Sequence, residues 1–324
     1  MKINYNYRST VKINQTLEKL SIKKQVFDLL PRFPQIELNL KRQSLLKSSL
    51  FSARIEGNPL ELNQLGSRST KDLLKLEVFN ILDALNWLYS KRSPKELNLK
   101  MILKLHGLVF KNIKPCGNLR KEPSAIFNQA GVAIYLAPPP DEVPQLLSKL
   151  ITQINQSTNL GSVKAAILHF AFEKIHPFLD GNGRVGRLLS TFILKQSGFG
   201  FRGLVSFEEY LENHRSIYYD LLANNQKDIT QFVEFFLIAL DTKAQQAIKN
   251  IKTTNQETPE DSLMSRRKEI LQIIRDHQLI SFDFIQRRFL SISSRSLHYD
   301  LKNLISRGFI KKEGITKGAL YFPV

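Results

Sequence analysis

The stretch Ile175–Leu189, IHPFLDGNGRVGRLL, carries an imidazole, a carboxylate, a Gly-Asn-Gly turn and two guanidinium groups, followed by apolar residues. Upstream of it, apolar spacing over 162–175 predicts a helix. That helix should end at His176, because Pro177 cannot continue it and restricts the residue before it. A second helix is expected to begin near 184–185. The stretch therefore predicts two helices joined by a polar loop.

The loop collects the groups that phosphate chemistry requires. The Gly-Asn-Gly turn (181–183) permits positive φ, so backbone N–H groups can converge on an anion at the start of the next helix. Arg184 and Arg187 lie three apart on that first turn and can clamp phosphate oxygens. Asp180 can hold Mg²⁺, and His176 can accept a proton near neutral pH. Together these residues predict phosphoryl or nucleotidyl transfer.

Each group has a simpler explanation when it is taken alone. A His before Pro commonly caps a helix, and Asp-Gly-Asn-Gly is a common turn. His169, Glu173 and His176 fall on one helical face, which is compatible with a metal site. The H-E-x-x-H spacing is absent, however, and His169 is more simply a buried, hydrogen-bonded helix residue.

The segment 176–187, HPFLDGNGRVGR, resembles the signature of the Fic family, H-P-F-x-[D/E]-G-N-[G/K]-R-x-x-R, at every position. The resemblance implies transfer of AMP from ATP to a Ser, Thr or Tyr hydroxyl of a target protein, and self-modification. It assigns the general base to His176, the Mg²⁺ ligand to Asp180 and the γ-phosphate contact to Arg187. The implied ATP and phosphate site comprises Asp180, Gly181, Asn182, Gly183, Arg184, Val185, Gly186 and Arg187.

Two other segments resemble parts of the same family's active site. The apolar run GVAIYLAPP (131–139) resembles the flap, a hairpin that pairs with the backbone of the target. Its candidate residues are Val132, Ala133, Ile134 and Tyr135, and a purely structural hairpin is the alternative. The segment RSIYYDLLANNQKD (215–228) resembles the part that closes over adenine. There Tyr218 and Tyr219 could stack on the base or serve as core aromatics, and Asn225 could bond the base.

An upstream stretch, FSARIEGNPL (51–60), resembles the inhibitory motif [S/T]-x-x-x-E-[G/N] of many Fic proteins. Ser52 and Glu56 lie one helical turn apart, and Gly57 with Pro59 should end the helix. A glutamate held against Arg187 would occupy the guanidinium that the γ-phosphate needs. The resemblance thus implies inhibition by an N-terminal helix, about 44–57, of the same chain. The alternative is a solvated residue at the end of a helix.

The fold class expected for the chain is mainly α. A Fic-type helical bundle with a small β-hairpin flap should precede a small winged-helix (α+β) domain. Further helical patterns cover 71–90, 142–155, 185–196, 206–223 and 228–250, then 266–277, 281–289 and 294–306. We expect an N-terminal helical region over 1–95, the catalytic domain over 96–250, a linker over 251–262 and the winged-helix-like domain over 263–324.

The composition of the chain indicates which kinds of partner to expect. The 324 residues carry a net charge of +18, which points to an anionic partner or to a lysine-rich solubility surface. The single cysteine fits a reducing cytoplasm, and no apolar run is long enough to cross a bilayer. Residues 263–324 hold twelve Lys and Arg against five Asp and Glu, a net +7, so this module could contact DNA or dock a protein. A homodimer is compatible with the resemblance.

Other functions use the same residues. The loop could remove AMP or transfer another phosphate-linked group, with Glu56 positioning a water. Alternatively, the chain could be a DNA-binding regulator whose Fic domain senses a nucleotide. The intact His176 and Asp180 argue against a mere sensor, which would not require a base.

Overall fold

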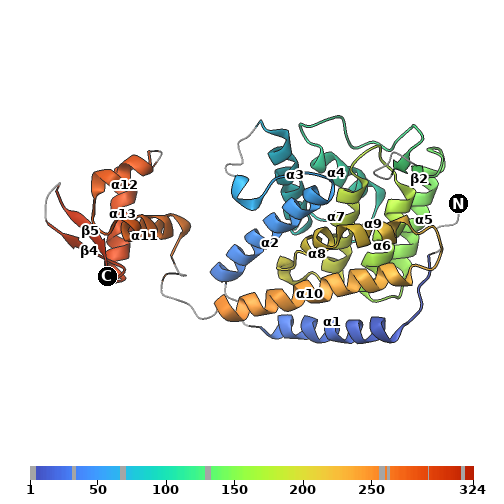
Figure 1. Cartoon of the computed structure of the whole chain (residues 1–324), viewed down its shortest axis with the longest axis horizontal. Coiled ribbons are helices and arrows are strands. Elements are labelled where there is room, and N and C mark those ends of the chain that lie inside the picture. Colours follow the sequence, from blue (N-terminus) through green and yellow to red (C-terminus); the bar gives the residue numbers. More distant parts are fainter. Residues whose placement is uncertain are drawn as a thin grey trace. The chain divides into compact units, whose positions relative to one another are not determined.

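A computed structural model describes residues 5–30, 34–65, 71–127, 133–254, 260, 263–290, 292–314 and 318–324. The chain divides into two compact units, Met1–Ile251 and Lys252–Val324 (Figure 1). Each unit has its own apolar core. The predicted fold class, mainly helical with two small sheets, is confirmed. Within the described part of the chain, no helix combines the length and apolar character needed to span a membrane.

The first unit is a bundle of α-helices with two short 3₁₀ turns, η1 (Leu62–Gln64) and η2 (Phe201–Gly203). Several helices begin at side-chain caps: the Thr10, Asp72 and Asn98 oxygens each accept a hydrogen bond from an amide of the first turn. The helices are α1 (Val11–Leu29), α2 (Pro34–Ile55), α3 (Leu73–Leu88), α4 (Leu99–Val109), α5 (Val143–Gln156), α6 (Gly161–Ile175), α7 (Asn182–Gln196), α8 (Glu208–Asn213), α9 (Arg215–Ala223) and α10 (Thr230–Thr254).

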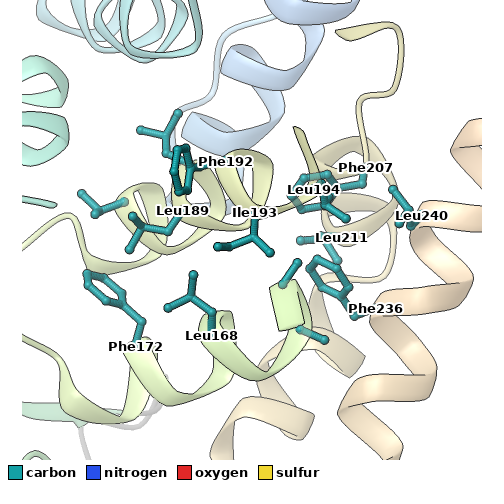
Figure 2. Packing of buried hydrophobic residues seen from close by; sticks show 14 of the residues in the cluster. Leu168, Phe172, Leu189, Phe192, Ile193, Leu194, Phe207, Leu211, Phe236 and Leu240 are labelled. Carbon is teal, nitrogen blue, oxygen red and sulfur yellow. The ribbon is translucent and has the colours of Figure 1, made fainter. Parts of the chain in front are cut away.

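Helices α6 and α7 form the centre of this unit. Every described residue of α6 from Gly161 to Ile175 is buried except Lys164, so the helix is surrounded by other elements. Leu168 and Phe172 of α6 lie opposite Leu189 and Ile193 of α7 (Figure 2). This packing fixes the two ends between which the polar loop 176–181 is held.

Helix α2 lies against α3, α8 and α7, and therefore reaches the N-terminal end of α7. Helices α1 and α10 run side by side along one edge of the unit (Figure 1). Lys23 Nζ on α1 lies 2.7 Å from Asp241 on α10, and Thr10 Oγ1 donates to Glu234 at 2.6 Å. These contacts close the bundle beneath α6.

A two-stranded antiparallel sheet joins β1 (Ala125–Phe127) to β2 (Ala133–Leu136). Its register pairs Ala125 with Leu136 and Phe127 with Ala133, with an irregularity after Ile126. Strand β2 lies within the segment 131–139 that the sequence predicts as the flap. Val132 falls outside the described residues, as do the side chains of Ala133 and Ile134.

The structure corrects three predicted boundaries. The helix expected over 206–223 is two helices, α8 and α9, because the backbone of His214 leaves the helical region at φ −121°. Helix α10 extends to Thr254, into the predicted linker, since Ile251 is 1% exposed and continues the apolar stripe. Helix α7 begins at Asn182, two residues earlier than expected.

The second unit has the arrangement of a winged helix. Its elements are α11 (Ser265–His277), β3 (Ile280–Ser281), α12 (Phe282–Arg288), α13 (Ser294–Ser306), β4 (Ile310–Glu313) and β5 (Leu320–Pro323). The sheet order is β3-β5-β4, antiparallel throughout. Ile270, Ile274, Leu297 and Leu301 bring α11 and α13 together in its core. Strand β3 was not predicted, because its two residues are too short for a periodic signal.

Candidate active site

The polar loop begins with a residue in an uncommon backbone conformation. His176 caps α6 with φ 49° and ψ 60°, in the left-handed region that non-glycine residues rarely adopt. Its carbonyl accepts a hydrogen bond from Arg120 Nε at 2.8 Å, and the next carbonyl, of Pro177, accepts from Arg120 N at 3.0 Å. A turn this strained persists only where its surroundings hold it, and it marks a functional position.

Asn182 holds the loop from inside. Its Oδ1 accepts from Phe178 N at 2.9 Å and its Nδ2 donates to Phe178 O at 2.8 Å. The side chain predicted to bind phosphate therefore shapes the loop with Oδ1 and one Nδ2–H, which leaves the second Nδ2–H and the backbone amide as donors. Gly181 must be glycine, because its φ is 84° and a Cβ would meet the Phe110 ring at 2.3 Å.

The N-terminus of α7 leaves amides available for an anion. The first intrahelical bond of α7 runs from Val185 N to Gly181 O at 3.0 Å. The amides of residues 182–184 precede it and have no helical acceptor. The positive end of the helix dipole adds to their field. The Gly-Asn-Gly turn predicts an anion at this position, called the anion site below, and binding there stays a prediction.

Arg187 is held by α2. Its Nη2 donates to Glu56 Oε1 at 2.8 Å and to Ser52 O at 2.8 Å, while its Nε donates to Ser52 Oγ at 2.9 Å. The arginine side chain is 1% exposed and that of Glu56 is 25% exposed. Burial alone lowers the pKa of Arg187, but the charge of Glu56 raises it above its ordinary value. The structure thus joins Ser52 and Glu56 to Arg187, which lies more than 130 residues further along the sequence.

The Glu56 carboxylate also covers the anion site. A Cβ built at Gly183 would lie 2.3 Å from Glu56 Oε1 and 3.0 Å from Arg187 Nη1. The missing side chain at Gly183 therefore makes room for the carboxylate over the first turn of α7. Glu56 takes a place that suits a phosphate, because it pairs with the guanidinium and lies at the positive end of a helix.

Two tyrosines predicted to contact adenine serve other roles here. Tyr218 is 1% exposed, and its hydroxyl lies 2.7 Å from His169 Nε2 and 3.4 Å from Arg187 Nη1. The adenine contact predicted for Tyr218 is not supported, because the ring is enclosed in the core behind Arg187. Tyr219 is 41% exposed and donates to Ile55 O at 2.9 Å, so it ties α9 to the end of α2.

Asp180 and Arg184 form an ion pair beside the anion site. Arg184 Nη2 donates to Asp180 Oδ1 at 2.5 Å and Nη1 donates to Glu77, while Lys114 donates to the other Asp180 oxygen. Burial raises the pKa of Asp180, but Lys114 and Arg184 outweigh it and hold the pKa below its ordinary value. The carboxylate is therefore charged, and its side chain is 45% exposed.

Asp180, the predicted metal ligand, does not belong to a larger group of metal-binding side chains among the described residues. The described residues contain no cluster of three or more His, Cys, Asp or Glu able to hold a metal ion. A single charged, half-exposed carboxylate fits Mg²⁺, which commonly takes one or two protein carboxylates and completes its shell with phosphates and water. The metal reading of His169, Glu173 and His176 is not supported, because His169 is buried against Tyr218.

The imidazole of His176 is oriented by its own helix. Its Nδ1 lies 3.3 Å from Glu173 O, and a carbonyl can only accept a hydrogen bond. Nδ1 therefore carries the proton, and Nε2 has the free lone pair. Burial lowers the pKa of His176 below its ordinary value, so the ring is neutral at pH 7. The ring can act as a base.

The remaining predicted residues lie around this centre. Lys174 Nζ donates to Asn225 Oδ1 at 3.0 Å and lies 4.2 Å from the centre of the Tyr135 ring, so it joins β2 to the segment after α9. Val185 is fully buried in the core. Gly186 lies against α6, because a Cβ there would meet Glu173 Oε1 at 2.6 Å. Both positions therefore pack inward, and the phosphate contacts predicted for Val185 and Gly186 stay predictions.

Several residues escaped the sequence prediction. Arg120, 4% exposed, donates to His176 O and to Pro138 O at 2.5 Å, so it links the flap end to the loop. His106 stacks on Phe178 and contacts Asp180 O at 3.2 Å, and Glu77 pairs with Arg184. None of them lies in a local motif, since each reaches the loop from a different element.

Comparisons with known proteins identify the domain that contains this loop. The Fic/DOC family model matches residues 96–194, which include β1, β2, α6 and most of α7. This region is a Fic domain. The Fic domain takes up about a third of the chain, and the structure adds α1–α3 before it and α8–α13 after it.

Relatives of the Fic domain extend the match beyond 96–194. The protein adenylyltransferase Fic of Drosophila willistoni is 28% identical over 250 residues, covering 71% of this chain and 48% of its own length. Protein adenylyltransferase fic-1 of Caenorhabditis elegans is 25% identical over 278 residues, covering 76% and 52%. The chain spans about half the length of the curated relatives it matches.

Solved Fic structures share the fold. A Fic family protein from Desulfovibrio desulfuricans G20 aligns with a TM-score of 0.69 at 22% identity, over 98% of this chain and 97% of that one. Fic-1 from C. elegans aligns with a TM-score of 0.63 at 25% identity, over 75% and 73%.

A buried carboxyl behind the Fic loop makes stability depend on pH. Burial and the charge of Glu56 raise the pKa of Glu173 from 4.5 to about 8. Between these values the unfolded chain is ionised while the folded one stays protonated, so stability falls as pH rises from about 4.5 to 8. The free energy of unfolding should fall less steeply with pH in Glu173→Gln, by about 1.4 kcal/mol per pH unit. Thermal or denaturant unfolding at several pH values measures this slope. The exposed Glu96→Gln should keep the wild-type slope, and an unchanged slope in Glu173→Gln would contradict the assignment.

Proposed function

We propose that the chain is a protein adenylyltransferase that transfers AMP from ATP to a hydroxyl of a target protein and is inhibited by its own Glu56. The observation that carries this is the Glu56 carboxylate, held by Arg187 over the first turn of α7. The carboxylate pairs with a buried guanidinium at the N-terminus of a helix, which is a position that suits a phosphate of the substrate. The names of the curated relatives support the same activity.

In the proposed reaction His176 is the general base. Its Nε2 takes the proton of the target hydroxyl, and the oxygen attacks the α-phosphorus of ATP. A new phosphorus–oxygen bond forms as the bond to the β-phosphate oxygen breaks, and pyrophosphate leaves. The hydrogen bond from Nδ1 to Glu173 O keeps the base in the required tautomer.

The other groups bind and orient the phosphates. The amides of residues 182–184 face the developing charge. Asp180 would hold Mg²⁺, which when bound neutralises the phosphates and orients the leaving group. Arg184 pairs with Asp180, so its guanidinium already lies beside the proposed Mg²⁺ ligand and can contact a phosphate bound there. The exposed strand β2, with Leu136 74% exposed, would receive the target by strand addition.

Inhibition follows from competition for one guanidinium. When Glu56 pairs with Arg187, the γ-phosphate loses its partner and the triphosphate is displaced from in-line geometry. A displacement of about 1 Å can cost on the order of a hundredfold in rate. The single free cysteine, Cys116, is compatible with action in a reducing cytoplasm.

We predict that Glu56→Gly raises AMP incorporation from labelled ATP, into the chain itself or a target, on the order of a hundredfold. The reason is that Arg187 becomes free for the γ-phosphate. The matched exposed variant Glu96→Gly should leave the rate near wild type. His176→Ala in the Glu56→Gly background should abolish incorporation.

Two outcomes would contradict this function. Equal rates in wild type and Glu56→Gly would refute inhibition through Arg187. If Glu56→Gly instead abolished release of AMP from protein modified beforehand, Glu56 would position a water and the reaction would run toward AMP removal.

The second unit suits an anionic partner, and we propose that it binds duplex DNA through α13. Arg295, Tyr299 and Lys302 are exposed and spaced as one stripe of that helix. The Arg267 guanidinium lies 5.4 Å from the centre of the Tyr299 ring and supports that side chain from α11. The buried Asp300 pairs with Arg266 and Arg267 and anchors α11 behind the stripe.

Removing charge from the stripe should weaken DNA binding. We expect Arg295→Gln with Lys302→Gln to lower duplex affinity and to reduce the slope of log affinity against log salt by about 2, one per phosphate contact. Lys19→Gln with Lys149→Gln removes equal charge from exposed positions of the first unit and should change neither. Fluorescence anisotropy with a labelled duplex measures both, and equal effects of the two pairs would leave nonspecific attraction as the explanation.

A further inference from the structure

A second hollow opens between α2, α8 and α10, and none of its lining residues belongs to the loop 176–187. The hollow is partly open to solvent. Residues 40–47 of α2 line one wall, and α10 lines another. The polar lining residues that matter below are Ser44, Lys47, Ser206, Glu209, Lys243 and Gln246.

Two hydroxyls on the walls have no partner. Ser44 is 9% exposed and Ser206 is 4% exposed, and neither Oγ makes a hydrogen bond within the described residues. Leaving a buried polar group unsatisfied costs about 1–3 kcal/mol. Both side chains line the hollow, and a χ1 rotation would turn either hydroxyl from its buried position toward a polar ligand there.

The charges of the hollow favour an anion. Lys243 pairs with Glu209 Oε2 at 2.5 Å and with Gln246 Oε1 at 2.6 Å. Lys47, half-buried on the facing wall, makes no ion pair among the residues that the structure describes. Two ammonium groups against one carboxylate leave one positive charge uncompensated. The fitting ligand class is a small anion with hydroxyl groups.

The same face of α2 leads from the hollow to Arg187. Ser44, Ser48 and Ser52 lie at fourth positions along one side of α2, and Glu56 follows directly after the helix ends at Ile55. Ser48 hydrogen-bonds to the buried Glu208 of α8, and Ser52 with Glu56 holds Arg187. This face is polar, whereas Leu45, Leu50 and Ile55 of the same helix are buried in the core and hold it in place.

We propose that the hollow is a regulatory site for a small hydroxylated anion, either a carboxylate or a phosphate. The ligand bridges α2 to α8 and α10, so it binds the docked state of α2 and stabilises it by linkage. Glu56 is then kept on Arg187. The effect on activity rests on the proposed function, whereas the binding itself does not.

Binding is tested first, on the full chain, by isothermal titration with glycerol 3-phosphate and with malate. We expect at least one of them to bind, and Lys47→Gln to weaken its affinity at least tenfold. Arg42→Gln removes the same charge from an exposed position of α2 and should change affinity less than twofold. If neither anion binds, or if both variants weaken binding equally, the site is refuted.

The regulatory effect is tested by AMP incorporation with the anion that binds. It should lower the wild-type rate severalfold, leave Glu56→Gly unchanged and fail to act on Lys47→Gln. Binding without an effect on the wild-type rate would refute the coupling to Glu56. A Glu56→Gly protein that transfers no AMP would refute the proposed function, while the titration would still decide the binding site.

Discussion

The ion pair between Glu56 and Arg187 is the interaction on which the rest of the site depends. Arg187 is almost fully buried, and leaving such a charge without a partner costs several kcal/mol. The guanidinium therefore requires an anion at all times. Glu56 supplies one in this structure, and a γ-phosphate would supply one in the proposed reaction. The choice between these two anions is what makes the site switchable.

The scaffold around Arg187 serves this choice. Ser52 and the Tyr218 hydroxyl fix the guanidinium from two sides, so only its anion changes. Gly183 leaves room for either anion at the start of α7. Behind it, Gly186 allows α6 and α7 to approach closely, which brings the neutral Glu173 and His169 under the pair. The strained His176 is then held by Arg120 at a fixed distance from the same cradle.

Much of this could be predicted from the sequence, because the loop and the inhibitory motif are contiguous stretches. Helix ends followed from Pro177 and from apolar spacing, and the family resemblance tied Glu56 to Arg187. The open alternatives have physical causes. The sequence left Tyr218 as either a base contact or a core aromatic, because an exposed and a buried tyrosine look alike in sequence, and its burial favours the core role. Val185 and Gly186 were grouped with the phosphate site because they lie on the first turns of α7. One side of that helix faces the core, and these two residues lie on it.

Other features carry no sequence signal. Arg120, His106 and Glu77 reach the loop from separate elements, and only their packing reveals them. The same holds for the hollow beside Ser44, since its walls come from three helices. The hydrogen bond between Ser48 and Glu208 is likewise visible only in the folded chain.

The most direct measurement of the central claim is a pair of crystal structures, of wild type and of Glu56→Gly, each with Mg²⁺ and an ATP analogue that cannot be cleaved at the α-phosphate. The account predicts that the γ-phosphate contacts Arg187 in the variant. In wild type Glu56 should keep that contact and the γ-phosphate should lie elsewhere. A γ-phosphate bound to Arg187 in both structures, with Glu56 displaced in wild type, would contradict competition for one guanidinium.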